Sequence, residues 1–200
     1  MDEEVVNRDR NSATVEREAT RNQGSGDPMS LLGSDHPVES LILRSNGFYG
    51  ALRKVGTSKF SELQIIDLSQ NKFTGHLPTT YFEIWDAMKI IDTSHMTYMG
   101  ESTSDPFPIF PCENYDYSIT MNNKGAELKY LKIPSTLAAI DFSCNRFEGA
   151  IPNVIGNLKA LHLLNLSNNM LTGHIPSSLA NMKELECLDL SSNWLSGQVP

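Results

Sequence analysis

Three cysteines are the residues of this 200-residue chain whose type most readily suggests chemistry. Cys112, Cys144 and Cys187 are separated by 32 and 43 positions, which matches no metal-binding or redox spacing. Three thiols also cannot all pair within one chain. A cysteine nucleophile needs a base held beside it, and no pattern places a histidine next to Cys144. Cys144 is therefore interpreted as an incidental thiol or one that lacks its pairing partner.

The histidines and carboxylates form no catalytic pattern either. His76 and His174 both follow a glycine and precede an apolar residue and a proline, so they belong to equivalent turns of two similar segments. No carboxylate pair, glycine-rich phosphate loop or cluster of metal ligands stands out from the sequence. We therefore expect a protein that is not an enzyme, with no catalytic residue, no cofactor and no metal site.

The elements that position these residues are copies of one repeat, anchored by asparagines. The last three anchors are 24 positions apart and the first two are 25 apart, whereas 74 positions separate the second from the third. About fifty surplus residues therefore interrupt the repeats. A buried row of amides can satisfy backbone groups of turns that no strand pairs, so we predict a structural role for the anchors. These are Asn46, Asn71, Asn145, Asn169 and Asn193.

Each copy contains a short strand with one buried face. Leu164 and Leu166 point to one side of the chain, while Asn165 and Ser167 point to the other, because side chains alternate along a strand. A glycine suited to positive φ and an apolar-proline pair follow in most copies. Stacked copies bury the leucines together, which predicts an α/β-type solenoid with a parallel sheet on its concave face.

The outward strand positions are the candidate binding residues. In the stacked copies they form columns on the concave face, which is the usual recognition surface of solenoids. Asn165 also begins the glycosylation sequon Asn-Leu-Ser, so a glycan is predicted there in a secreted form. The candidates in the repeats are Asp67, Ser69, Gln70, Asp141, Ser143, Asn165, Ser167 and Asp189.

The interruption, residues 79–136, has a different composition from the repeats. It holds nine of the sixteen aromatic residues and four of the eight methionines, types that are enriched at interfaces. Thr80 to Glu83 resembles a capping box, and the apolar residues from Tyr81 to Ile91 have helical spacing, which predicts a short amphipathic helix. A period of two on both sides of residues 122–125 predicts a β-hairpin. Tyr115, Tyr117 and Lys124 are the further candidates for partner contact.

Charge and composition divide the chain into four segments. Residues 1–36 carry four arginines against eight acidic residues and form a charged leader that we expect to be disordered. Repeats occupy residues 37–78 and, truncated, residues 137–200, on either side of the insertion.

The net charge is −8 and the repeats lack a basic stripe, so nucleic acid is not an expected partner. No apolar run is long enough to span a bilayer and no signal peptide is present, so we expect no membrane contact by this chain itself.

The repeat "LxxLxLSxNxLxGxIPxxLxNLxxL" resembles the plant-type leucine-rich repeat. The flanks of the insertion, "LQIIDLSQNKFTGHLPTTYFEIWDAMK" and "YDYSITMNNKGAELKYLKIPSTLAAIDFSCNRFEGAIP", resemble those of the island in plant leucine-rich-repeat receptor-like proteins of the Cf type. This resemblance covers residues 38–200. It implies a C-terminal ectodomain fragment on the extracellular side of the plasma membrane, without a kinase, in defence or development signalling. Its implied partners are a protein or peptide ligand and receptor kinases.

Two other functions compete with this one. A secreted enzyme inhibitor similar to the polygalacturonase-inhibiting proteins shares the repeat, but that family carries no island. A non-functional gene fragment would account for the missing signal peptide and the missing cysteine caps. Steroid-binding receptor kinases also carry an island, so a small apolar ligand is a further possibility. Because neither end of the repeats is capped, we expect the chain alone to associate.

Overall fold

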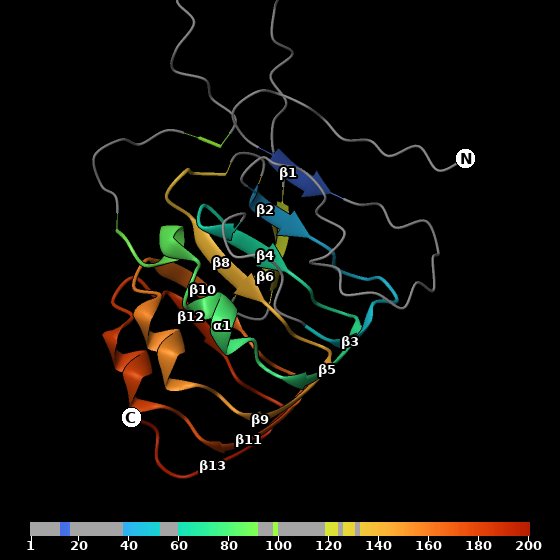
Figure 1. The fold of residues 1–200 in the computed structure, drawn as a ribbon, viewed down its shortest axis with the longest axis vertical. Helices are drawn as coiled ribbons and strands as arrows, with labels where there is room; N and C mark the ends of the chain where they lie inside the picture. The colour runs from blue at the N-terminus through green and yellow to red at the C-terminus, as the bar shows by residue number, and fades with distance from the viewer. Residues whose placement is uncertain are drawn as a thin grey trace, which may run out of the picture.

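The computed structural model describes residues 13–16, 38–52, 60–91, 98–99, 119–123, 126–130 and 133–200. One strand of each repeat joins a six-stranded sheet in which all neighbours are parallel (Figure 1). We call it the concave sheet. Its strands, in order, are β1 (Ala13–Glu16), β2 (Val38–Ile42), β4 (Ile65–Asp67), β8 (Ala138–Asp141), β10 (Leu161–Asn165) and β12 (Cys187–Asp189).

A second parallel sheet lies along another side of the stack (Figure 1). Each of its strands contains or ends next to the repeat glycine, which has positive φ in all five copies, for example +78° at Gly149. A residue with a Cβ is strained in that conformation, so the predicted need for glycine is confirmed. In chain order its strands are β3 (Tyr49–Ala51), β5 (Lys72–His76), β9 (Arg146–Ala150), β11 (Met170–His174) and β13 (Trp194–Ser196).

Short helical turns follow the second-sheet strand in three of the described repeats. Pro78, Pro152 and Pro176 stand immediately before three of them, because proline ends the strand pairing and its fixed φ suits a helix start. The turns stack across the insertion, since α1 lies against η4. They are α1 (Thr79–Phe82), η3 (Asp86–Met88), η4 (Asn153–Asn157) and η5 (Ser177–Asn181).

The anchor asparagines tie neighbouring coils together. The amide nitrogen of Asn169 donates to the carbonyl oxygens of Leu166 and Ser167 in its own repeat, and of Phe142 in the preceding one. Its amide oxygen accepts from the backbone N–H of Phe147 at 3.0 Å. Asn71, Asn145 and Asn193 repeat this pattern, and the Asn46 amide donates to two carbonyls of its own turn.

A column of rings fills the interior beside this ladder. The Phe73 ring stacks between those of Phe48 and Phe147, with centroids 6.2 Å and 6.1 Å away. Leu171 and Leu195 take the same position in the last two repeats. The column of apolar side chains therefore continues through all five repeats, with leucine in place of phenylalanine in the last two.

The helix predicted at the start of the insertion is shorter than its apolar spacing indicates. α1 ends at Phe82, and the expected capping box is wrong, because Pro78 is the N-cap and no side chain caps the helix. The backbone leaves the helical region at Trp85, where ψ is 74°, and the buried indole packs on the rings of Tyr81 and Phe82. Ile91, expected on the same face, is exposed. Core packing overrides helical periodicity here.

Two further segments of the described chain bear on the predicted organisation. The hairpin is confirmed, since β6 (Ile119–Asn123) pairs antiparallel with β7 (Ala126–Tyr130). In the segment expected to be disordered, Ala13–Glu16 instead forms β1 and extends the concave sheet beside β2. An open sheet edge provides backbone partners for any nearby extended segment, which composition alone does not reveal. The divisions at residues 36, 78 and 136 stay predictions, although α1 and η3 pack as part of the repeat stack.

Candidate recognition surface

The register of the concave sheet sets the candidate carboxylates side by side. Asp67 pairs with Asp141, Asp141 with Asn165, and Asn165 with Asp189. Each begins a tight turn, because its side-chain oxygen accepts a hydrogen bond from the backbone N–H two residues later. The serine hydroxyls of two turns add a second bond, from Ser69 to Asp67 at 2.6 Å and from Ser167 to Asn165 at 2.8 Å.

Burial removes most of these candidates from solvent. Asp67 is 0% exposed and Asp141 is 1% exposed, so the expected open row of polar side chains is not available at this part of the sheet. Asp189 is only partly buried and Gln70 is exposed. The side chain of Gln70 accepts a hydrogen bond from the Ser45 hydroxyl at 2.7 Å. The other buried candidates are Ser69, Ser143, Asn165 and Ser167.

Burial also changes the charge of this row. It raises the pKa of Asp67 to about 6, with a further rise from the neighbouring carboxylate of Asp141. Hydrogen bonds from Ser69 and the charge of Arg44, whose Nε lies 3.9 Å from Oδ2, lower that pKa in part. The pKa of Asp141 is raised by burial, against hydrogen bonds from Ser143 and Asn165 that lower it.

An apolar row lies two residues before the polar one on the same strands. Met99 and Ile133, two residues of the insertion, form a cluster with the outward residues Ile65, Ala139, Leu163 and Cys187. The backbone N–H of Met99 donates to the carbonyl oxygen of Ile133 at 2.8 Å, and Tyr98 and Pro134 form an antiparallel bridge. We call residues 98–99 and 133–134 the stem. The apolar outward residues at positions 65, 139 and 163 could have predicted that this part of the sheet is covered.

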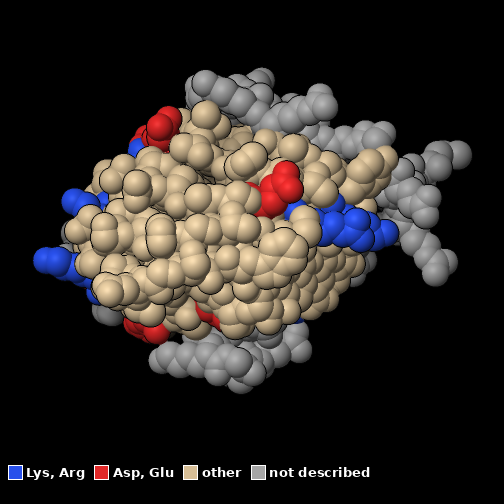
Figure 2. All heavy atoms as spheres, turned by 90° about the horizontal axis from the view of Figure 1, so that it is seen from below, with Lys and Arg blue, Asp and Glu red and all other residues tan. Residues whose placement is uncertain are grey.

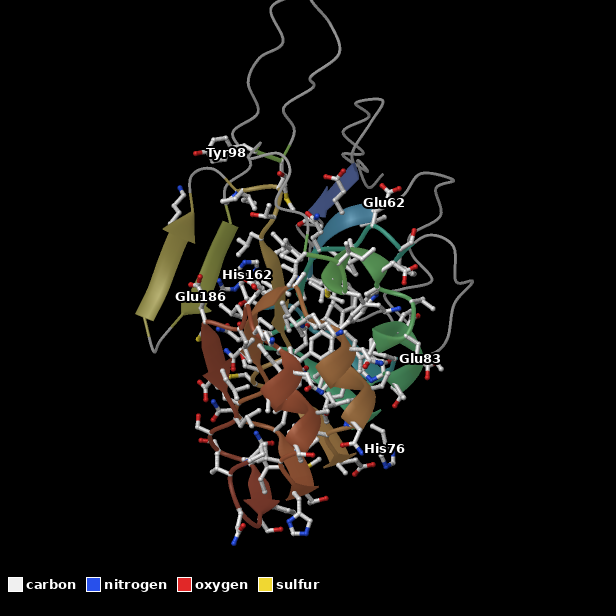
Figure 3. The ribbon with its side chains drawn as sticks, turned by 90° about the vertical axis from the view of Figure 1, so that its left-hand side faces the viewer. Glu62, His76, Glu83, Tyr98, His162 and Glu186 are labelled. Carbon is white, nitrogen blue, oxygen red and sulfur yellow. The ribbon has the colours of Figure 1, made fainter. Side chains whose placement is uncertain are left out.

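The hairpin β6–β7 is set off from the stack of repeats, on the side where His162 and Glu186 lie (Figure 3). Lys124, at its turn, and the candidates Tyr115 and Tyr117 lie outside the described residues. Two separate segments of the insertion therefore meet at the stem, against the apolar row of the concave sheet.

Comparison with known proteins gives the chain its relatives. The family profile "Leucine rich repeat" matches residues 135–195, and a second profile of that description matches residues 62–82. "Receptor-like protein 34" of Arabidopsis thaliana is 43% identical over 139 residues, which is 68% of this chain and 13% of that protein. "Receptor-like protein 52" of the same plant is 46% identical over 132 residues, 66% of this chain and 15% of that protein. The chain belongs to the plant leucine-rich-repeat receptor-like proteins.

Solved structures agree on the fold of this receptor-like chain. The PEPR1–AtPEP1 crystal structure superposes with a TM-score of 0.53 at 26% identity, over 82% of this chain and 16% of that one. The ectodomain of the receptor kinase SOBIR1 from Arabidopsis thaliana gives a TM-score of 0.50 at 21% identity, over 82% of this chain and 61% of that one. The likeness to SOBIR1 concerns the fold alone.

The predicted glycosylation site of the receptor-like chain is enclosed in the folded state. Asn165 is buried, and its Nδ2 donates to Asp141 Oδ2 at 3.3 Å. A glycan on this nitrogen would have to break that hydrogen bond and push aside the residues that bury this face of the sheet. Glycosylation at Asn165 stays a prediction, and it would have to precede folding.

The two cysteines of the described segments differ in exposure. Cys144 is exposed in a turn with φ of 53°, while Cys187 is buried in the apolar row and Cys112 lies outside the described residues. No group of three or more His, Cys, Asp or Glu side chains among the described residues could hold a metal ion. The described part of the chain also contains no helix long and apolar enough to cross a membrane.

Proposed function

We propose that this chain is a non-enzymatic recognition module, a part of a receptor-like ectodomain that binds a protein or peptide ligand and a receptor kinase on the extracellular side of the plasma membrane. The observation that carries the proposal is the stem, which packs on the apolar row of the concave sheet through Met99 and Ile133. A rigid stack of repeats with one non-repeating segment anchored on it suits selective binding of a shaped partner.

The related proteins support the same class of function. The relatives are receptor-like proteins, and the chain spans about 13% of their length. The structural neighbour PEPR1 was solved together with AtPEP1. The insertion contains eight acidic residues against four lysines, and this net negative charge favours a basic ligand segment.

Replacing the insertion above its stem tests the proposal. A short Gly-Ser linker in place of residues 100–132 keeps the Met99–Ile133 backbone pair, which already brings both ends together. We expect a panel of secreted plant peptides, proteins and receptor-kinase ectodomains to yield at least one partner by calorimetry. The linker variant should lose that partner while its melting temperature stays unchanged.

Two outcomes would contradict the proposal. Inhibition of a polygalacturonase that survives the linker replacement would favour the inhibitor function. Binding of a small apolar molecule, with no affinity for any peptide or protein of the panel, would move the ligand to another chemical class.

A further inference from the structure

Two buried carboxyl groups lie next to each other across the join of β4 and β8. Asp67 and Asp141 are paired in the parallel register, and neighbouring strands are about 4.8 Å apart. Both side chains point to the concave side, where each accepts a hydrogen bond from the backbone two residues later. Their burial is complete enough that water does not screen one charge from the other.

The two groups are unequally compensated. Asp141 Oδ2 accepts from the Asn165 amide, whereas Asp67 Oδ2 is buried without a hydrogen bond. The Nε atom of Arg44 lies 3.9 Å from Asp67 Oδ2, too far for a hydrogen bond, and that side chain is partly exposed. For Asp67, burial and the neighbouring carboxylate outweigh the hydrogen bonds from Ser69 and the charge of Arg44, which favours retention of a proton.

We propose that Asp67 and Asp141 hold one proton between them in the folded chain, and that loss of this proton loosens the stem of the insertion. The stem side chains pack on Ile65 and Ala139, two residues before the two aspartates on the same face of the same strands. Hydration of a second carboxylate requires water at this face of the sheet. Met99 and Ile133 cover the apolar row that adjoins the two aspartates, so their movement would bring water to the edge of the pair.

The direction of the pH effect follows from the raised pKa values. Folding raises the pKa of Asp67 from about 4 to about 6 and raises that of Asp141 as well. Below about pH 4 the carboxyl of Asp67 is protonated in the folded and the unfolded chain alike. The closed stem is therefore most stable in acid and weakens as the pH rises through about 6. The charged groups of the described chain that act on Asp67 are Asp141 and Arg44.

Residue-resolved hydrogen exchange of the purified chain at pH 5 and pH 7.5, corrected for intrinsic exchange, tests this inference. The probe is the amide of Met99, which donates to Ile133 across the stem. We expect its protection to fall by at least about tenfold at the higher pH. The reference is the amide of Phe147, bonded to Asn169 in the second sheet, whose protection should not change.

Asp67→Asn removes the charge and keeps an oxygen acceptor for Ser69, so we expect it to abolish the pH dependence at Met99. The matched control Asp189→Asn changes a partly exposed aspartate of the same row and should retain the native response. Asp141→Asn is the second variant, to be used if the first does not fold. An unchanged pH response in the Asp67 or Asp141 variant would overturn the inference. So would an equal response at Phe147, since the opening would then be global. These outcomes do not depend on the identity of any ligand.

Discussion

The side-chain oxygen of Asn145 accepts a hydrogen bond from the backbone N–H of Phe73 at 3.0 Å, although 72 positions separate the two residues. The Asn145 amide also donates to the carbonyl oxygen of Leu68 at 2.9 Å, in the repeat before the insertion. The repeats on the two sides of the insertion therefore stack directly on each other. The insertion leaves the solenoid and returns to it without altering the join.

Asn145→Ala should destabilise the chain more than any exposed asparagine replacement. It leaves the buried Phe73 N–H unpaired, and it removes one of two donors from the carbonyl oxygens of Leu68, Phe142 and Ser143. A buried group left unpaired costs roughly 1–3 kcal/mol, so we expect a loss of that size in unfolding free energy by urea titration. Asn157→Ala, at an exposed position of η4, is the control and should change stability little. Equal stability of the two variants would contradict a structural role for the amide ladder.

Gly149→Ala should be destabilising for two separable reasons. Its φ of +78° strains any residue with a Cβ, and that atom would lie 2.4 Å from the His76 ring. His76→Ala in the same chain should recover the steric part of the loss in melting temperature and leave the backbone strain. Gly47→Ala, where an added Cβ meets nothing within 4 Å, should be neutral. Failure of His76→Ala to recover any stability would show that the ring already moves freely.

Glu39→Gln should stabilise the chain near neutral pH. Burial raises the pKa of Glu39, and the neighbouring carboxylate of Glu62 raises it further. The native glutamate therefore loses folding stability as the pH rises through this pKa, while glutamine does not. We expect a higher melting temperature for the variant at pH 7 and none of this gain at pH 3.5. Glu148→Gln, at an exposed position of β9, should show no such difference. A gain that persists at pH 3.5 would point to packing instead of charge.

The chain should associate through the end of the stack at which β13 lies. Trp194 is 72% exposed and Val199 is 82% exposed, and few charged side chains interrupt the face seen from that end (Figure 2). We expect light scattering to show concentration-dependent oligomers. Trp194→Lys combined with Val199→Lys should reduce them, whereas Tyr49→Lys, on a strand at the opposite edge of the second sheet, should not. A monodisperse native monomer would refute this prediction.

Local sequence patterns were sufficient to predict the repeat unit. Alternating residues such as Leu164 and Asn165 define the two faces of a strand, because side-chain direction depends only on backbone geometry. The glycine position and the hairpin around residues 124–125 follow from equally local backbone requirements. Neighbouring copies then have only one way to bury their leucines together, so the solenoid and its parallel register could also be inferred.

The cover of the outward face could be read only in part. Asp67 and Asp141 occupy the outward positions that their pattern predicts, yet they are enclosed, and Met99 and Ile133 pack on the adjoining apolar row. The apolar outward residues at positions 65, 139 and 163 indicate a covered face, but strand periodicity does not say which distant segment covers it or that the neighbouring aspartates are buried as well. The early end of α1 at Phe82 has the same origin, since the place of the Trp85 ring depends on residues from several repeats. Side-chain direction is a local property, whereas burial, and the pKa values that follow from it, arises from long-range packing.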